Sequence, residues 1–582
     1  MVTPSENVWI CLVIVVVAFL VLLPFSVIGV DVHHDGIMLK PAVDVAEGQM
    51  LHRDTFSQYG PLTTLTHAAL LNVFGKKLIV LRVATALMYS LSLGALFLTW
   101  RMILPMSLCL VSVCIWFCLV PFYRPGWHIL PWSSSEALLI QSVCLWLMTV
   151  AQSQRKAASA FLLITGVGAL ASAVFWCRQP VGGLLAISGA SIPVFLQLQF
   201  QGQAVGLKPS LVHFVIRNRF LWGYVIGGVL PALLMLTWLY YNDALIPWYE
   251  QNILWPRVFA SGYFSLRSVY QCFGTTQIII PCCMLVVLLL LPALLRKLNV
   301  GKRWGVCAVA AIGAFWCVFV HFRPQILTLT IIEKSIPIMT VGLVSLLALR
   351  REWSIVLLAC RLGLLFPVLA SWSQYYPVPC IRHMFWGVCP ALGLFVFLLS
   401  HTLNANYRQI AVAILMLFMP LVAQRISEAS DHLRWAGDEI RDVEMLAGMR
   451  PYRSPVSGVE LLRGFEADFD WFASLCRRLR RDFERTPLIV NGDDALFALL
   501  SVDKRNPGPF YVTWSQLDMF GLWDARSEFI REHRPLILVE CEIGVVQDFT
   551  AYLRQGYEQE FLGVAFGKDM YLLVPSAARL PN

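Results

Sequence analysis

The chain has 582 residues, of which 58% are hydrophobic and only 14% are charged. Soluble globular domains average about 25% charged residues, so the composition excludes an ordinary soluble enzyme and indicates a polytopic α-helical membrane protein. The net charge of +9 is modest, and in such a protein basic residues are better explained as a topology signal than as a nucleic-acid-binding surface. We therefore expect no nucleic-acid partner.

Hydrophobic runs recur along the first 424 residues. A helix needs roughly 20 apolar residues to cross the hydrocarbon core of a bilayer. By that measure we predict about 13 transmembrane helices, near residues 8–30, 77–100, 103–121, 135–152, 158–176, 181–200, 220–241, 273–295, 304–320, 336–349, 353–371, 386–401 and 409–424. The first run is too long for the hydrophobic region of a signal peptide, so we interpret it as a retained span.

Basic residues in alternate turns give the expected orientation. Arg101, Arg155, Arg296 and Arg350 each lie in a short turn on the same side as the N-terminus. The positive-inside rule places such turns in the cytoplasm. We therefore expect a cytoplasmic N-terminus, with the loop 31–76 and the C-terminal tail on the outer face.

The first outer loop, residues 31–76, is rich in ionisable side chains. Two stretches, 37–46 and 61–74, have helical apolar spacing, and each is followed by a glycine. They predict two short interfacial helices that lie along the membrane. Ionisable groups next to a span are costly unless they have a function, so the loop is the first candidate for a site.

Charged residues become dense after residue 424. Strand-like runs follow at 487–492, 510–514, 535–540 and 567–575, with helical stretches at 524–532 and 545–554. The pattern predicts a transmembrane domain over 1–424 and a small extracytoplasmic α/β domain over 425–582. No glycine-rich phosphate-binding motif occurs, so the sequence gives no support for a nucleotide site.

Two carboxylates are candidates for catalysis. Asp35 follows the first span in the sequence HHDG, where it could act as a general base at the membrane surface or cap the helix that follows. Glu136 opens the fourth span on the same side, where it could join the site or stabilise the N-terminus of its own helix. The residues alone leave these alternatives open.

Metal-ligating side chains also occur in the first loop. Asp31, His34 and Glu47 are close enough in sequence to hold a divalent ion, and a solvated polar loop is the alternative. No CxxC pair occurs, so neither a zinc ribbon nor a redox motif is indicated.

Several basic side chains lie in the predicted outer loops, where a lipid phosphate would lie. Arginine binds phosphate in a bidentate manner, and extension of each long side chain to the membrane interface is the alternative for each one. These residues are Arg53, Arg178, Arg323, Lys334 and Arg382, with His383 beside the last.

Taken together, these motifs resemble the type C membrane glycosyltransferases. The resemblance is carried by HHDG (33–36), EGQMLHRDTFSQYGP (47–61), the acidic residue that opens a later span, HFRPQ (321–325) and YYPVPCIRHMFW (375–386). Within that group, the chain is similar to the branch that contains the protein O-mannosyltransferases and the lipid A aminoarabinose transferase. The first motif reads D-G where the mannosyltransferases have D-E, which points away from protein mannosylation.

The resemblance implies a reaction and a set of roles. Such enzymes move a sugar from a polyprenyl-phosphate carrier to an acceptor on the outer face of the membrane. The first-loop carboxylate acts as the base, which corresponds to Asp35, and the second acidic position corresponds to Glu136. Basic residues of later outer loops hold the carrier phosphate, which corresponds to Arg323 and Lys334.

Further contacts are expected within the shared motifs. Arg53, Asp54 and Tyr59 of the first loop, and Arg382 with His383 of the later one, are expected to bind the substrate or its lipid phosphate.

The expected function is a hexosyl- or pentosyltransferase that acts by inverting displacement. The partners are the polyprenyl-phosphate sugar, a lipid, glycan or protein acceptor, and the bilayer, which the resemblance places at the bacterial inner membrane with a periplasmic active site. No cofactor is expected beyond the divalent ion considered above.

Two other functions are compatible with a polytopic membrane protein. An O-antigen-type polymerase or ligase would use a diphosphate-linked oligosaccharide and a large late outer loop, whereas here the large loop is the first. A transporter of lipid-linked glycans would show repeated halves with broken helices, and the sequence shows no repeat.

Overall fold

The computed structural model describes residues 4–26, 32–123, 129–201, 216–258, 329–355, 381–403, 421–434, 486–491, 523–542, 550–565 and 568–576, with shorter pieces at 358, 368, 370–375, 414, 471, 474–475, 477–479 and 481–483. In this part of the chain seven helices are long and apolar enough to cross a membrane. They are Asn7–Ser26, Leu78–Ile103, Ser133–Ser153, Ala157–Cys177, Gln179–Phe200, Arg219–Tyr241 and His383–Thr402.

These helices confirm a mostly helical membrane protein, but not the number of spans. Each of the seven corresponds to one predicted span, and two shorter apolar helices, Met106–Leu119 and Ser335–Leu349, correspond to two more. The predicted spans 273–295 and 304–320 lie outside the described residues, and those at 353–371 and 409–424 are described only in part. The count of 13 stays a prediction.

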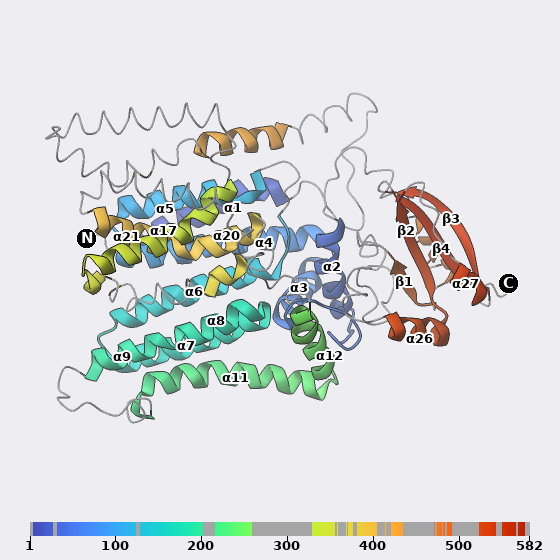
Figure 1. Ribbon diagram of the computed structural model, residues 1–582, viewed down its shortest axis with the longest axis horizontal. Helices are drawn as coiled ribbons and strands as arrows, with labels where there is room; N and C mark the ends of the chain where they lie inside the picture. The colour runs from blue at the N-terminus through green and yellow to red at the C-terminus, as the bar shows by residue number, and fades with distance from the viewer. Residues whose placement is uncertain are drawn as a thin grey trace.

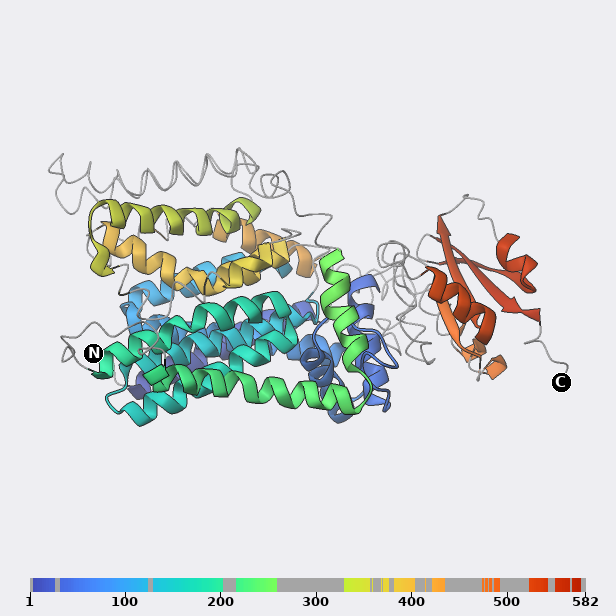
Figure 2. The same ribbon diagram turned by 60° about the horizontal axis from the view of Figure 1, so that its bottom comes forward.

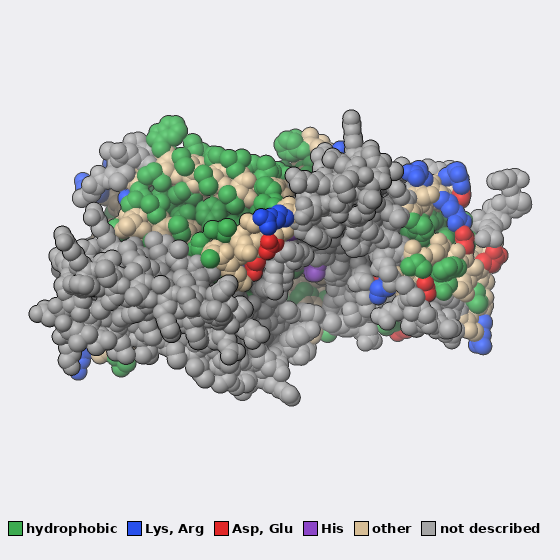
Figure 3. Space-filling view, turned by 90° about the horizontal axis from the view of Figure 1, so that it is seen from above, with side chains coloured by type: hydrophobic (Ala, Val, Ile, Leu, Met, Phe, Trp, Pro, Cys, Tyr) green, Lys and Arg blue, Asp and Glu red, His purple; other side chains and the backbone are tan. Residues whose placement is uncertain are grey.

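The first helix, α1 (Pro4–Ser26), shows why the bundle suits a lipid environment. Its buried side chains are Ile14, Ala18, Leu22 and Phe25, which are spaced by three or four residues and so share one helix face. The opposite face is exposed yet equally apolar, with Val13, Val16, Val17 and Leu20 among its residues. A helix that is hydrophobic all round belongs in a membrane or a large core. Figure 3 shows a patch of hydrophobic side chains on part of the bundle surface.

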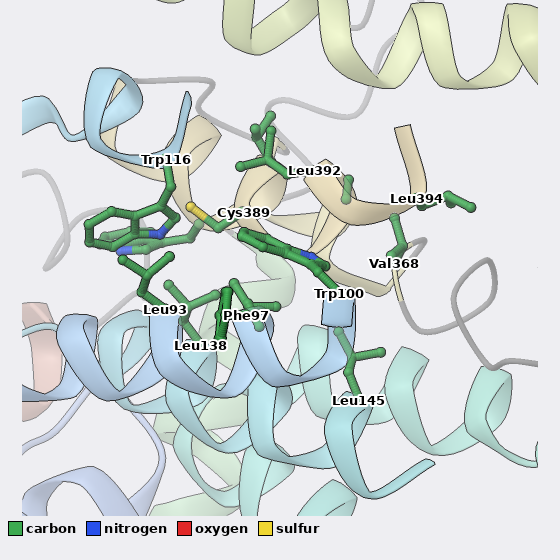
Figure 4. Close-up of a cluster of buried hydrophobic side chains, with 14 of the residues drawn as sticks. Leu93, Phe97, Trp100, Trp116, Leu138, Leu145, Val368, Cys389, Leu392 and Leu394 are labelled. Carbon is green, nitrogen blue, oxygen red and sulfur yellow. The ribbon is translucent and has the colours of Figure 1, made fainter. Parts of the chain in front are cut away.

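A tightly packed core joins α4 (Leu78–Ile103), α5 (Met106–Leu119), α6 (Ser133–Ser153) and α21 (Leu392–Leu403). Figure 4 shows Trp100 and Phe97 of α4 pointing toward Cys389 and Leu392, residues some 290 positions away in the sequence. All four are buried.

Prolines divide two of the predicted spans. The span predicted at 181–200 consists of α8 (Gln179–Gly189) and α9 (Ser191–Gln201), and Pro193 lies just after the break. The span predicted at 386–401 begins earlier, as α20 (Ile381–Val388), and passes through a short 3-10 turn that holds Pro390 before α21 begins. Proline lacks an N–H and clashes with the preceding turn.

Small residues bring α7 (Ala157–Cys177) and α11 (Arg219–Tyr241) into backbone contact. A Cβ atom added to Gly168 would lie 2.1 Å from the carbonyl oxygen of Tyr224, and one added to Gly227 would lie 2.0 Å from that of Thr165. Close approach through glycine is the usual way that helices pack without a hydrophobic driving force in lipid.

The two helices of the first loop lie at one end of the bundle, together with a short helix from later in the chain. α2 (Val32–Ala46), α3 (Pro61–Phe74) and α12 (Leu245–Tyr249) lie at the end that faces the C-terminal sheet, while the N-terminus lies at the other end (Figures 1 and 2). The 61–74 helix is confirmed at both ends, whereas α2 begins five residues earlier than predicted.

The C-terminal part forms a mixed four-stranded sheet in the order β1-β2-β4-β3. β1 (Leu488–Asn491) pairs with β2 (Leu536–Glu542) in parallel, and β4 (Lys568–Pro575) pairs antiparallel with both β2 and β3 (Tyr557–Ala565). Between them come α26 (Trp523–His533) and α27 (Thr550–Arg554). The sheet confirms the predicted strands at 487–492, 535–540 and 567–575, and that at 510–514 lies outside the described residues.

The sheet buries apolar side chains on both faces. Ile489, Ile537 and Val539 pack on one face with Ile530 of α26. Leu488, Val490 and Leu536 form the other face in a cluster that also contains Phe56 of the first loop. Phe56 also stacks on Trp255, with ring centroids 5.8 Å apart. The cluster therefore joins the C-terminal sheet to the membrane-side loop.

We predict that Gly168→Ala lowers the thermal unfolding midpoint of the purified protein, because the new methyl group would force α7 away from α11. Gly166 lies on the same helix, and a Cβ there would meet nothing within 4 Å. Gly166→Ala is therefore the matched control and should leave the midpoint unchanged or slightly higher. Equal midpoints for the two variants would contradict the close contact.

Candidate active site at the first loop

Asp35 lies inside α2, and its carboxylate forms an ion pair with Arg82. The helix begins at Val32, so Asp35 is in its first turn and is not the cap that the sequence allowed as an alternative. Both carboxylate oxygens accept hydrogen bonds from the guanidinium of Arg82 in α4, one of them from Nε at 3.2 Å. Asp35 is 2% exposed and Arg82 is 0% exposed. The pair is therefore a buried, bidentate ion pair that connects α2 to α4.

A second buried ion pair lies one helical turn further along α2. Lys40 donates to Asp44, and the other oxygen of Asp44 accepts a 2.7 Å hydrogen bond from the hydroxyl of Thr55. Burial lowers the pKa of Lys40 and raises that of Asp44, and each partner opposes the shift of the other. The sequence singled out Asp44 only as a possible metal ligand and did not single out Lys40, because a mixed-charge pair at i, i+4 also suits a solvated helix.

Glu136 lies at the N-terminal turn of α6, beside α3. The hydroxyl of Thr66 donates to Glu136 Oε1 at 2.8 Å, and Thr63 and Cys177 lie beside the same carboxylate. Glu136 is 6% exposed, and its Oε2 has no hydrogen-bond partner among the described residues. A buried carboxylate oxygen without a partner is rare, and it requires an explanation such as a water or a ligand.

Glycine brings α3 against the end of α7 and so positions this carboxylate. Gly60 donates its backbone N–H to the carbonyl of Cys177 at 3.2 Å. A Cβ at Gly60 would lie 2.0 Å from the carbonyl oxygen of Trp176. Only glycine permits this approach, which places the first turn of α3 against Glu136.

Two candidate histidines from different predicted loops contact the same tryptophan. His34 and His383 both lie against Trp132, with ring centroids 5.0 and 5.6 Å away, and Trp386 completes the group at 5.2 Å from Trp132. Trp386 Nε1 donates to the hydroxyl of Tyr89 at 2.9 Å. His34 precedes Asp35 by one position and Trp132 precedes Glu136 by four, so this aromatic group is directly adjacent in sequence to both carboxylates.

A polar network connects the first loop to residues almost 200 positions away. His52 Nδ1 lies 2.9 Å from Gln251 Oε1, and Gln251 Nε2 donates to the carbonyl of His52 at 2.9 Å. Asn252 Nδ2 donates to the carbonyl of Ser57 at 3.2 Å, and Asn252 Oδ1 accepts from Gln179 at 2.8 Å. Gln251 and Asn252 lie in a π-helical turn, Glu250–Leu254, a feature often found at functional sites.

The remaining candidates fall into three groups. Arg53 and Asp54 are exposed and hydrogen-bond to each other at 2.8 and 2.9 Å, and Arg53 also donates to the carbonyl of Asn242. Tyr59 and Arg178 are half-buried, close to the contact between α3 and the end of α7. Arg323 and Asp31, and the side chains of Lys334 and Arg382, lie outside the described residues.

The predicted metal ligands do not form one site. His34 and Glu47 stand at opposite ends of α2, which at a rise of about 1.5 Å per residue separates them by roughly 20 Å. Glu47 instead pairs with Lys76 at 2.9 Å. Among the described residues no three His, Cys, Asp or Glu side chains come close enough to hold a metal ion.

Comparison with solved structures gives matches of low identity. ArnT from Cupriavidus metallidurans, crystallised with undecaprenyl phosphate, is 13% identical over the full length of both chains, with a TM-score of 0.43. The oligosaccharyltransferase of Archaeoglobus fulgidus, crystallised with zinc and sulfate, is 11% identical over 90% of this chain and 68% of its own, with a TM-score of 0.41. At TM-scores below 0.5 these likenesses do not establish a shared fold.

Two further comparisons gave no match. No protein-family model and no curated protein matches the chain.

We predict that Asp35→Asn strongly destabilises the protein, because it leaves the Arg82 guanidinium buried without its anion. Removing one partner of a buried pair typically costs about 3–5 kcal/mol. The double variant Asp35→Asn, Arg82→Gln should regain much of the loss in a thermal unfolding experiment. Glu47→Gln breaks an exposed pair and should change the midpoint little. A double variant no more stable than Asp35→Asn would contradict the pairing.

We also predict that stability falls as the pH drops from about 6.5 toward 4. Burial lowers the pKa of His52 and of His67 to about 4, so the unfolded chain binds protons in this range while the folded chain does not. Each histidine then removes about 1.4 kcal/mol of unfolding free energy per pH unit. His67→Gln should flatten the measured pH profile, whereas substitution of the exposed His533 should not. An unchanged profile in His67→Gln would contradict the burial of a neutral imidazole.

Proposed function

We propose that the chain is a glycosyltransferase that moves a sugar from a polyprenyl-phosphate carrier to an acceptor hydroxyl or amine at the membrane surface. The observation that supports it best is the concentration of buried ionisable groups at one end of an otherwise apolar helical bundle. Asp35–Arg82, Lys40–Asp44 and Glu136 all lie there. Buried charges at the edge of a membrane are expensive and are kept for a function.

The proposed reaction is one inverting displacement. A carboxylate takes the proton of the acceptor O–H as the acceptor oxygen forms a bond to the anomeric carbon. The bond from that carbon to the phosphate oxygen breaks, and the polyprenyl phosphate leaves with the electron pair. Both substrates are confined to the bilayer surface, which lowers the entropy cost of bringing them together.

Two carboxylates are available for the proton, and the geometry separates them. The resemblance assigns the base to Asp35, but both of its oxygens already accept hydrogen bonds from Arg82. Glu136 keeps one oxygen without a hydrogen-bond partner among the residues that the structure describes. We therefore propose Glu136 as the proton acceptor in this arrangement, with Asp35 and Arg82 as the positioning pair that fixes α2.

Basic side chains would stabilise the leaving phosphate. Arg178 lies where α7 meets α8, half-buried and next to Cys177. We propose that it acts with Arg323, Lys334 and Arg382 on the developing charge of the leaving group, which is the usual role of preorganised cations in phosphate chemistry.

The proposed orientation follows from the same arrangement. The C-terminal sheet and the first loop share one end of the bundle, and the N-terminus lies at the other (Figures 1 and 2). We propose that the shared end faces the periplasm of a bacterium and that the N-terminus is cytoplasmic, as the basic turns predict.

The test is sugar transfer in membranes from a panel of polyprenyl-phosphate hexoses and pentoses. We predict that Glu136→Gln lowers the rate at least about 100-fold, as expected for loss of a general base, with thermal stability close to that of the wild type. Glu47→Gln, which changes an exposed carboxylate of the first loop, is the matched control and should keep wild-type activity.

Two other outcomes are informative. Full activity of Glu136→Gln together with a stable but inactive Asp35→Asn, Arg82→Gln variant would return the base to Asp35. No transfer by the wild type from any carrier-linked sugar would contradict the proposed function.

A further inference from the structure

His52 has features that no role given above explains. It is 2% exposed, and its ring Nε2 is buried without a hydrogen-bond partner among the described residues. Its backbone has a φ of +68°, in the left-handed region that few residues other than glycine adopt and in which histidine, asparagine and aspartate are the most frequent exceptions. Strain of this kind persists only where the surrounding structure enforces it, and it is concentrated at functional sites.

The neighbouring hydrogen bonds determine which ring nitrogen carries the proton. Gln251 Oε1 accepts from the backbone N–H of Ser57 at 3.2 Å, and Gln251 Nε2 donates to the His52 carbonyl. This fixes the Gln251 amide with its oxygen toward the ring and favours the tautomer with the hydrogen on His52 Nδ1, where the Asn252 amide nitrogen is a second, longer neighbour at 3.5 Å. Nε2 is then a bare acceptor, directed away from Gln251 on the other side of the ring.

The ligand that would satisfy this acceptor is neutral. Every hydrogen-bond partner shown for the network is a side-chain amide or a backbone group, from Gln251, Asn252, Gln179 and Ser57. Burial keeps the imidazole itself neutral by lowering its pKa to about 4. A phosphate would find no cation in this network, whereas a hydroxyl group would donate to Nε2.

Unpartnered donors lie in the packing cluster that flanks the network. Trp176 and Trp248 pack against each other with ring centroids 5.1 Å apart, in a cluster that includes Met50 and Ile253. The indole Nε1 of each is buried without a partner among the described residues. A ligand that both donates and accepts hydrogen bonds beside aromatic rings is typical of a carbohydrate.

From these observations we infer that His52 Nε2 accepts a hydrogen bond from a hydroxyl group of the donor sugar, so that the first loop binds the sugar itself and not only its phosphate. This inference rests on the proposed function for the identity of the ligand. It adds His52, with Gln251 as the positioning residue, to the residues that determine which sugar is used.

The first arm of the test uses His52→Asn in the transfer assay. Asparagine tolerates a positive φ, and its amide N–H can replace Nδ1–H toward Gln251, so the variant removes mainly Nε2. We expect unchanged thermal stability and about a tenfold loss in kcat/KM for the donor, the size of one lost hydrogen bond. His52→Asn with wild-type kcat/KM would overturn the inference.

The second arm does not depend on activity. Full-length protein in lipid nanodiscs is unfolded by heat with and without ligand, and the ligand-induced rise in the unfolding midpoint is compared between the wild type and His52→Asn. We expect polyprenyl-phosphate-linked glucose, galactose or mannose to protect the wild type more than His52→Asn, and polyprenyl phosphate alone to protect both equally. Equal protection of the two proteins by every lipid-linked sugar would overturn the inference.

The two arms separate this inference from the proposed function. Protection by a lipid-linked sugar without any transfer would support the sugar site while contradicting the transferase reaction. Transfer with neither protection nor a kinetic effect at His52 would leave the proposed function intact and overturn the sugar site.

Discussion

The buried ion pair between Asp35 and Arg82 is the interaction on which the rest of the site depends. It connects the first turn of α2 to the N-terminal part of α4, and so fixes α2 at the end of the bundle. In the same loop, Asp44 of the Lys40–Asp44 pair accepts a hydrogen bond from the Thr55 hydroxyl. The carbonyl of Thr55 accepts from the backbone N–H of His52, which fixes the turn that contains His52. Burial of two charges is tolerable only when each finds its partner. The pair therefore specifies one position of α2 over the bundle and excludes a freely solvated loop.

The bundle and the first loop differ in the chemistry of their side chains. The spanning helices expose apolar side chains and approach one another through glycine, as α7 and α11 do at Gly168 and Gly227. The loop instead gathers carboxylates, amides and imidazoles at one end of the bundle, where they are buried. Phe56 joins this end to the C-terminal sheet through a shared hydrophobic cluster. The sheet is thus attached to the loop and can influence access to the site.

Much of the architecture could be predicted because it follows local rules. Apolar length predicted the seven helices that the structure shows to be long enough to span, and glycine after helical spacing predicted α3 at both ends. Strand β3 was missed because it is an edge strand whose first five residues, YEQEF, are mostly polar and mostly exposed or half-buried. Edge strands do not need the apolar pattern that reveals central strands.

The site was only partly predictable, for a different reason. Asp35 and Glu136 are charged residues at the ends of apolar runs, so composition alone drew attention to them. Arg82 sits inside an apolar run and has a function only through its partner 47 positions earlier. The contact between His52 and Gln251 joins residues 199 positions apart, and no periodicity encodes such a distance.

The central claim is that carrier-linked sugar is bound at the first-loop end of the bundle. The most direct measurement is photo-crosslinking of the full-length protein in membranes with a polyprenyl-phosphate sugar that carries a photoreactive group on the first isoprene units, followed by peptide mapping. The account predicts crosslinks concentrated in α2, α3 and the N-terminal turns of α6 and α8. Crosslinks concentrated at the opposite end, around Arg155 and Lys156 between α6 and α7, would contradict it.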